Sequence, residues 1–314
     1  MLKNYLPKFK LVEKENYDYK FTIFVPVYNA EKTIHKVFAS IENQTFNDFE
    51  VIIINDGSTD NSNLIISKSI ENINYKCTYI NNDKNINKMG VFFQAIKLAK
   101  GEFFLIHDAD DESLPESLSV FNKRYEEIPE DLKENISGVT CRCKNQFGKL
   151  IGKALPQDPF YSNSFESSIL YGLSFEKWGF VKTRLLKSIQ VDDFIFGKGL
   201  IPEGFIWLVF AKEGYITKYC SDIIRIYYID NVNNLSSLKY DKKALGMCLY
   251  GLLFINYFYS DYFLKASKHF VKRTISVLIS SKYLEFKLTD YLSSIDSWLV
   301  KIVFLLLWPF RRFL

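Results

Sequence analysis

The chain has 314 residues, of which 48% are hydrophobic and 17% are aromatic. This composition excludes a disordered polymer, and the length suits one large domain or one domain with an appendage. The formal net charge of +4 is too small to indicate nucleic-acid binding. The sequence also has no basic motif interleaved with aromatic residues, so we expect no nucleic-acid partner.

The cysteines and the hydropathy pattern indicate in which cellular compartment the protein is expected. The five cysteines are odd in number and scattered, which favours reduced thiols in a cytoplasmic protein over a disulfide framework. Residues 1–20 are charged and have no apolar core, so we expect no signal peptide. The longest apolar stretch, residues 302–310, has about half of the ~20 residues that a membrane-spanning helix needs. We therefore expect a chain that does not cross a membrane but can lie on one.

The first half of the sequence alternates strand and helix patterns at the spacing of βαβ units. Short apolar runs predict buried parallel strands at residues 21–25, 51–54 and 103–106, and an edge strand at 76–80. Apolar residues at helical spacing predict helices at 34–41, 60–71 and 91–99. Ser113-Leu-Pro-Glu116 predicts a capping box for a further helix that runs to about residue 125.

The second half is less regular. It predicts a strand at 138–143, a polar loop at 157–168, a helix at 205–212 and an extended segment at 219–230. Residues 241–314 are helical by pattern, and we place a soft boundary near 230–238. The chain is thus divided into an α/β domain at 1–235, with halves 1–115 and 116–235, and a helical, amphipathic C-terminal region at 236–314.

Three of the predicted strands end in polar turns. These turns are Pro26-Val27-Tyr28-Asn29, Asn55-Asp56-Gly57-Ser58 and Asp108-Ala109-Asp110-Asp111. Open α/β sheets bind ligands at the carboxyl ends of their strands. We therefore expect the three turns to face one crevice.

The acidic turns suggest specific chemistry. Asp108 and Asp110 flank a small residue, so both carboxylates can converge on a hard cation such as Mg²⁺ or Mn²⁺ that neutralises a departing diphosphate. The alternative is a solvated acidic loop that caps the next helix. The carboxylate of Asp56 can accept the imide N–H of a uracil or thymine ring, and its alternative is ordinary turn chemistry.

Taken in order, the segments at 22–29, 51–60 and 99–111 closely resemble the family 2 glycosyltransferases of the GT-A fold. The resemblance covers about the first 115 residues. It implies a GT-A (Rossmann-like) mixed sheet with helices on both faces, followed here by the helical C-terminal appendage. It also implies a nucleotide-sugar donor, a divalent metal and inversion at the anomeric carbon, with residues 1–115 as the nucleotide-sugar half and 116–235 as the acceptor half.

The resemblance assigns donor-site residues one by one. The nucleotide-sugar-binding residues are Pro26, Val27, Tyr28, Asn29, Asp56, Asp108, Ala109 and Asp110, and Asp108 and Asp110 are the ligands of Mn²⁺ or Mg²⁺. Lys88 matches the basic residue of a subgroup motif, of which this chain retains only the lysine; a solvated lysine is the alternative. Arg225 matches a segment that closes over the donor and is a diphosphate candidate.

The catalytic base is expected in the second half. Family members carry Glu-Asp near a Trp before a helix, and this chain has Glu203-Gly204 followed by Trp207. Inversion by single displacement needs a carboxylate opposite the leaving group, so Glu203 is the candidate, and Gly204 leaves space for an acceptor oxygen. The alternatives are a glutamate favoured by the helix dipole, or Asp192 and Asp193 as the base.

The sequence identifies residues of the acceptor side less specifically. Trp178 can stack on a sugar ring, although a tryptophan is more often core, and Asp111 is placed on the same side. The resemblance implies transfer from a UDP- or dTDP-sugar to a hydroxyl of a glycan, with a polyprenyl-linked surface-polysaccharide intermediate as the expected acceptor. A silent nucleotide-sugar-binding or membrane-scaffold protein and a sugar nucleotidyltransferase are the rival functions.

The C-terminal region suggests a membrane surface as a partner. Residues 264–314 contain nine Lys or Arg and three acidic residues. Leu299, Ile302, Val303, Leu306 and Phe310 fall near helical spacing, which suits an interfacial helix. We therefore expect a peripheral location at the inner face of the cell membrane, with a helix packed on the domain as the alternative.

Overall fold

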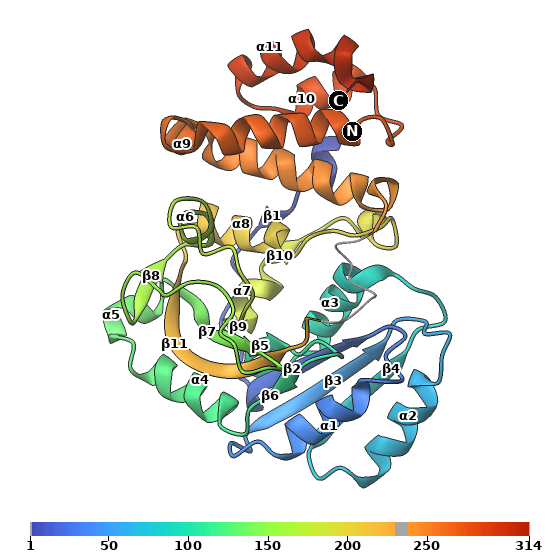
Figure 1. Ribbon diagram of the computed structural model, residues 1–314, viewed down its shortest axis with the longest axis vertical. Helices are drawn as coiled ribbons and strands as arrows, with labels where there is room; N and C mark the ends of the chain where they lie inside the picture. Colours follow the sequence, from blue (N-terminus) through green and yellow to red (C-terminus); the bar gives the residue numbers. More distant parts are fainter. Residues whose placement is uncertain (1, 230–237, 314) are drawn as a thin grey trace.

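The computed structural model describes residues 2–229 and 238–313 and is built around one mixed sheet (Figure 1). Its strands lie in the order β4, β3, β2, β5, β9, β7, β11, β6, with β8 paired to β11. Their bounds are Tyr19–Val27 (β2), Phe49–Asn55 (β3), Lys76–Asn81 (β4), Gly101–Ile106 (β5), Glu112–Ser113 (β6), Ile136–Asn145 (β7), Phe160–Ser162 (β8), Lys177–Lys182 (β9) and Ile216–Tyr227 (β11). Strands β2 to β5 run parallel, and β9 runs antiparallel to both β5 and β7. A separate pair joins β1 (Lys8–Phe9) to β10 (Ile189–Gln190).

The elements predicted in the first half are confirmed. All four strands form, and β4 is at the edge of the sheet as expected. The helices are Ile34–Glu42 (α1), Ser62–Ser69 (α2), Asn87–Leu98 (α3) and Ser117–Glu126 (α4). Helix α3 begins four residues before its apolar pattern, which places Lys88 in its first turn.

The predicted capping box before α4 is wrong. Ser113 lies in β6, and the N-cap position belongs to Glu116, whose side chain makes no capping bond. The side chain of Gln44 instead accepts from the backbone N of Leu118 at 3.1 Å. A tertiary contact therefore replaces the local one, because Ser113 is used to pair β6 with β11.

The expected polar loop at 157–168 is also structured. It contains β8 and helix α6 (Ser164–Ile169), whose first turn is capped by Asn163, which accepts from the backbone N of Glu166 at 2.8 Å. Phe165 is fully buried in the core and anchors this helix. The aromatic residues of this segment, Phe160, Tyr161 and Phe165, stand among polar ones without a helical or alternating period, so the sequence did not predict an element there. The other helices of this half are Glu130–Lys133 (α5), Thr183–Lys187 (α7) and Gly204–Lys212 (α8).

The C-terminal region is helical, as predicted. Helix α9 (Ala244–Ser280) breaks at Ala266, where the backbone leaves the helical region, and its two arms lie one over the other (Figure 1). The rings of Phe254 and Phe270 meet between the arms, with centroids 4.9 Å apart. Helices α10 (Leu288–Ser294) and α11 (Trp298–Leu307) follow. The predicted boundary near 230–238 lies almost entirely outside the described residues.

Helix α11 is buried on one side only. Val300 and Phe304 are buried, and the ring of Phe304 stacks on Tyr291 of α10. The opposite side is apolar and at least 44% exposed at Leu299, Ile302, Val303, Leu306 and Phe310. None of the described helices is long and apolar enough to span a membrane. The helix thus packs on the domain and still presents an apolar face.

The two faces of the sheet carry separate cores, because strand side chains alternate between faces. In β2, Phe21 and Ile23 point to the core under α1, α2 and α4, whereas Phe24 points to the other. This second core continues without interruption from β2 and β3 through α3 and α8 into α9 and α11. The helical region is therefore packed onto the α/β part through shared core residues.

The first turn of α9 supports the loop that leads into α8. A Cβ atom at Gly246 would lie 2.1 Å from the carbonyl oxygen of Leu200 and 2.7 Å from the Cα atom of Ile201. Only a glycine permits this backbone approach. The loop that ends at Glu203 therefore rests directly on α9.

Replacing Gly246 by alanine should destabilise the fold, because the new methyl group overlaps backbone that has little room to move. We expect a loss of ~1–3 kcal/mol in the free energy of unfolding, typical of overpacking. Urea denaturation followed by circular dichroism measures it. Ser260→Ala, at an exposed position of the same helix, is the control and should stay within about 0.5 kcal/mol; equal stability of the two variants would contradict the expectation.

Candidate functional site

The residues predicted at the first two strand ends form one rim. Asn29 has a left-handed backbone (φ 51°), which asparagine tolerates, and its side-chain oxygen accepts from the backbone N of Thr59 at 2.8 Å. The backbone N–H of Asp56 donates to the carbonyl of Val27 at 2.7 Å, and its carboxylate accepts from the backbone N of Ile86 at 2.8 Å. Burial raises the pKa of Asp56. The loops after β2 and β3 are thus tied to the start of α3.

The remaining residues of this rim differ in exposure. Pro26 is partly buried at the end of β2, and the side chain of Tyr28 is 53% exposed. Ala109 packs partly buried against the core of the first half. Tyr28 and Asn29 are thus the exposed residues of this rim, whereas Pro26 and Ala109 are partly buried.

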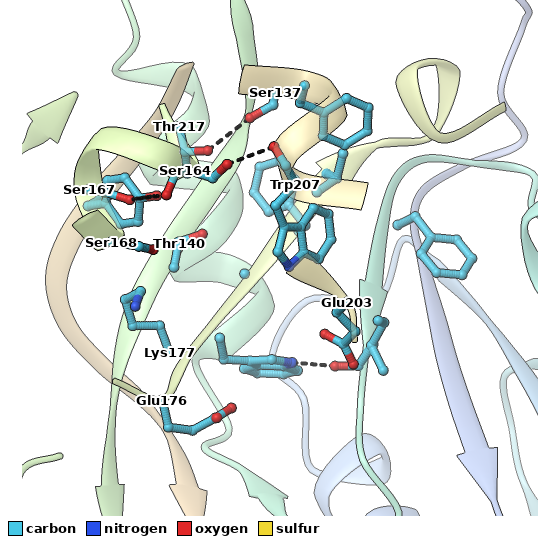
Figure 2. A pocket seen from close by; sticks show the side chains of 18 of the residues that line it. Ser137, Thr140, Ser164, Ser167, Ser168, Glu176, Lys177, Glu203, Trp207 and Thr217 are labelled. Carbon is cyan, nitrogen blue, oxygen red and sulfur yellow. Dashed lines mark hydrogen bonds between the residues drawn. The ribbon is translucent and has the colours of Figure 1, made fainter. Parts of the chain in front are cut away.

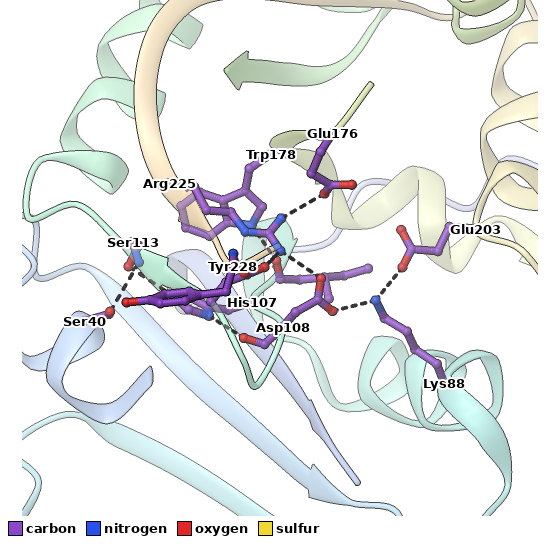
Figure 3. Close-up of polar contacts among 12 residues, drawn as sticks. Ser40, Lys88, His107, Asp108, Ser113, Glu176, Trp178, Glu203, Arg225 and Tyr228 are labelled. Carbon is purple, nitrogen blue, oxygen red and sulfur yellow. Dashed lines mark hydrogen bonds and ion pairs between the residues drawn. The ribbon is translucent and has the colours of Figure 1, made fainter. Parts of the chain in front are cut away.

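Asp108 is held between two cations (Figure 3). Its Oδ1 lies 2.5 Å from Nζ of Lys88, and its Oδ2 lies 2.9 Å from Nη2 of Arg225. Burial would raise the pKa of Asp108, but the two positive charges lower it well below its usual value. Asp108 is therefore ionised in the site.

Lys88 joins Asp108 to the predicted catalytic base. Its Nζ also lies 2.7 Å from Oε1 of Glu203, which stands at the N-cap position of α8. Burial would lower the pKa of Lys88, but the two carboxylates raise it, so the lysine stays charged. The structure thus brings three predicted site residues from α3, the end of β5 and the start of α8 into one contact.

Arg225 and Asp111 lie in a buried network behind Asp108. The Arg225 side chain is only 2% exposed and forms ion pairs with Asp111 and, at 3.3 Å, with Glu176. Asp111 also accepts from the backbone N of Tyr228 at 3.0 Å. In this arrangement Arg225 orients Asp108, and Asp111 fixes Arg225 rather than facing open solvent.

Negative charge exceeds positive charge in this cluster. Burial and the neighbouring charge of Asp108 raise the pKa of Asp110. Among the described residues, five carboxyl groups face two cations: Asp108, Asp110, Asp111, Glu176 and Glu203 against Lys88 and Arg225. Burial raises the pKa of Asp111 to about 7, so this group carries only part of a charge near neutral pH. Oxygen donors with an excess of negative charge suit a hard divalent cation. The residues present therefore fit the kind of metal that the sequence implies, and Asp108 and Asp110 remain its predicted ligands.

A cavity of about 290 Å³ opens from this cluster (Figure 2). Asp108, Glu176 and Glu203 line it together with Trp178 and Trp207. The indole N–H of Trp178 donates to the carbonyl of Ile106 at 2.5 Å, and the side chain is otherwise mostly buried. Trp178 is thus part of the core and of the cavity wall.

Three sequence-based expectations about this region need revision. The space beside Gly204 is filled, because a Cβ atom there would lie 2.8 Å from the ring of Tyr250 on α9. Asp192 caps the turn Asp193–Ile195 by accepting from the backbone N of Phe194 at 2.9 Å. Neither Asp192 nor Asp193 lines the cavity.

Glu176 is a site residue that the sequence reasoning missed. It directly precedes β9, contacts Arg225 and faces the cavity with Glu203 (Figure 3). Burial raises its pKa. The only sequence signal was its place two residues before Trp178, which no motif marked.

Parts of the chain are similar in sequence to known glycosyltransferases. Residues 22–133 match the family model described as Glycosyl transferase family 2. The chain is 29% identical over 190 residues to the poly(ribitol-phosphate) beta-N-acetylglucosaminyltransferase TarS of Staphylococcus aureus, covering 55% of this chain and 29% of TarS. It is 26% identical over 218 residues to a GalNAc(5)-diNAcBac-PP-undecaprenol beta-1,3-glucosyltransferase of Campylobacter jejuni, covering 67% of this chain and 65% of that protein.

Solved structures resemble the whole described fold. The crystal structure of S. aureus TarS 1–349 in complex with UDP-GlcNAc superposes with a TM-score of 0.54 at 21% identity, over 88% of this chain and 82% of that one. The chain spans less than a third of full-length TarS and 15% of a teichoic acid poly(glycerol phosphate) polymerase of Staphylococcus epidermidis, to which it is 32% identical over 106 residues. Residues 22–133 thus match glycosyltransferase family 2, and the fold of the described residues is GT-A.

Proposed function

We propose that the protein is an inverting glycosyltransferase that moves a sugar from a UDP- or dTDP-sugar to a hydroxyl group of a glycan acceptor. The observation that carries this proposal is the contact of Lys88 with both Asp108 and Glu203, at 2.5 and 2.7 Å. It places a carboxylate of the acceptor half beside the expected diphosphate site. A single-displacement reaction needs this pair of groups in one site.

Each part of the proposed site has a stated task. Pro26, Val27, Tyr28, Asn29 and Asp56 bind the nucleoside, and Lys88 offers its charge to the diphosphate. Glu203 takes the proton from the acceptor hydroxyl as it attacks the anomeric carbon, and the diphosphate leaves from the opposite face. Because Arg225 is enclosed by carboxylates, we now assign it to positioning Asp108.

Asp108 and Asp110 would hold Mn²⁺ or Mg²⁺. The bound metal would supply Lewis-acid stabilisation of the leaving diphosphate. The excess of carboxylates over cations in the cluster supports this assignment, because a diphosphate adds further negative charge. Asp108 and Asp110 lie in the loop between β5 and β6, so this loop would lie close to the diphosphate.

The base assignment predicts a specific defect in Glu203→Gln. Donor binding should survive, because the shape of the side chain is kept, whereas transfer should fall by ~10²- to 10⁴-fold. Isothermal titration with UDP and a radiolabelled transfer assay separate the two effects. Asp192→Asn, at a carboxylate outside the cavity, is the matched control. Collapse of transfer in the control, with near-normal turnover in Glu203→Gln, would move the base to that residue.

The metal assignment predicts that Asp110→Ala abolishes metal-dependent transfer without unfolding the protein. The residue lies in a strand-end loop and contributes charge rather than core packing. Transfer is measured with Mn²⁺, with Mg²⁺ and with EDTA, and the melting temperature of the variant is compared with wild type. Full turnover in the variant or in EDTA would refute the assignment.

The proposed acceptor is a polyprenyl-linked intermediate of a surface polysaccharide, and the protein is proposed to act at the inner face of the cell membrane. Support comes from the exposed apolar face of α11, where Leu299, Ile302 and Leu306 are 44 to 66% exposed. Lys301, Arg311 and Arg312 lie on or just after the same helix and can reach anionic head groups. Interfacial binding combines these two contributions.

This proposal predicts that Leu299→Ser, Ile302→Ser and Leu306→Ser together weaken vesicle binding. Each side chain should contribute roughly a factor of ten if it is buried in the interface. Co-sedimentation with phosphatidylglycerol-containing and phosphatidylcholine vesicles measures the loss and its dependence on charge. Leu64→Ser, at an equally exposed position on α2, is the control. Equal binding of both proteins, or none, leaves α11 as a packed helix only.

A further inference from the structure

The cavity lies under α8, in line with the donor site. The sheet order places β3 and β2, which carry Asp56 and the first turn, next to β5, which carries Asp108. The next strand is β9, whose residues Lys177 to Val181 line the cavity. A donor with its nucleoside at β2 and β3 and its diphosphate at the end of β5 would therefore extend its sugar over β9.

The cavity has more volume than a single six-membered ring needs. Its volume is about 290 Å³, roughly twice that of a ~150 Å³ engineered cavity that holds benzene. It extends past Trp178 between β7, β9 and β11 on one side and α6 and α8 on the other. There is room for a six-membered ring and for a substituent that reaches further in.

The part of the cavity beyond Lys177, called its inner end below, mixes hydroxyl groups with apolar walls (Figure 2). Thr140 of β7 and Ser168 of α6 bring hydroxyls from two sides, and Phe104 and Phe210 supply aromatic surface. A hydroxyl both donates and accepts a hydrogen bond. Such a lining matches a group that has one donor, one acceptor and an apolar end.

Hydrogen bonds fix these walls in place. The Ser164 hydroxyl donates to the carbonyl of Trp207 at 2.7 Å and joins α6 to α8. The hydroxyls of Ser167 and Tyr219 are 2.9 Å apart and join α6 to β11. The cavity is therefore a preformed space between bonded elements.

We propose that this cavity selects a donor whose sugar carries an N-acyl group, and that the acyl amide occupies the inner end between Thr140 and Ser168. The amide supplies one N–H donor, one carbonyl acceptor and a methyl group, which match the hydroxyls and the aromatic walls. A plain hexose leaves this end without contacts. The inference rests on the proposed glycosyl-transfer function, because it places the donor in the same site.

Donor binding tests the inference without an acceptor. UDP and dTDP are titrated first, with Mn²⁺, and then UDP-GlcNAc is compared with UDP-glucose and UDP-GalNAc with UDP-galactose. The N-acetyl donor of at least one pair should bind about tenfold or more tightly than its hexose partner, since filling or leaving a cavity of this kind changes affinity by ~10- to 200-fold. UDP alone should bind equally well to all folded variants.

Two variants fill the inner end from opposite sides. Thr140→Met and Ser168→Met should each weaken binding of the preferred N-acetyl donor by ~10-fold or more, with little change for the hexose partner, because the added atoms occupy the space of the acyl group. Ser69→Met is the matched control, since it is also a partly buried serine at a helix end but lies outside the cavity. Melting temperatures confirm that each protein is folded.

The outcomes are distinguishable. Equal affinity for N-acetyl and hexose donors, or equal weakening of both by the methionine variants, overturns the inference and leaves glycosyl transfer intact. Loss of the preference in Thr140→Met and Ser168→Met, with UDP binding kept, supports it. Failure of folded wild-type protein to bind either UDP or dTDP overturns the proposed function and the inference together.

Discussion

The double ion pair of Asp108 is the contact on which the site depends. One oxygen is bound by Lys88 from α3, in the first half of the chain, and the other by Arg225 from β11, near the end of the α/β part. Arg225 is itself enclosed by Asp111 and Glu176. Removing Lys88 or Arg225 leaves Asp108 with one counter-charge instead of two, and a partly compensated charge in this setting is costly. The acidic turn is therefore held by both halves of the fold and not by its own loop.

The same contact sets the electrostatic condition for a ligand. Lys88 is shared between Asp108 and Glu203, so it cannot fully neutralise either carboxylate. A diphosphate entering here meets the ammonium group of Lys88 and the guanidinium group of Arg225, both already paired with carboxylates, so an accompanying cation would favour its binding. The proposed metal, the proposed carboxylate base and the lysine between them are therefore mutually consistent. Each of the three would be poorly placed without the other two.

The sequence predicted the strands and helices that have a local hydropathy pattern. It did not predict contacts between residues that lie far apart in the sequence. Strands β2, β3 and β5 contain continuous apolar runs, and the order of the motifs that follow them indicated the fold family. The adjacency of Glu203 and Asp108 depended on a resemblance, because no periodicity relates the two positions. Glu176 was missed since one carboxylate before a strand has no signature. The space expected at Gly204 is taken by Tyr250 from α9, a residue that a local pattern cannot bring there.

The helical region has two structural roles that follow from one packing arrangement. Its first arm touches the loop before α8 at Gly246 and at Tyr250, so the position of Glu203 is determined by α9 as well as by the sheet. Its last helix is buried through Phe304 against Tyr291 and exposes apolar residues on the other side. A continuous core connects the two. A surface that binds the exposed face of α11 would therefore also fix the position of α9, against which the loop carrying Glu203 packs. This is a physical reason for one chain to combine the α/β part with the C-terminal helices.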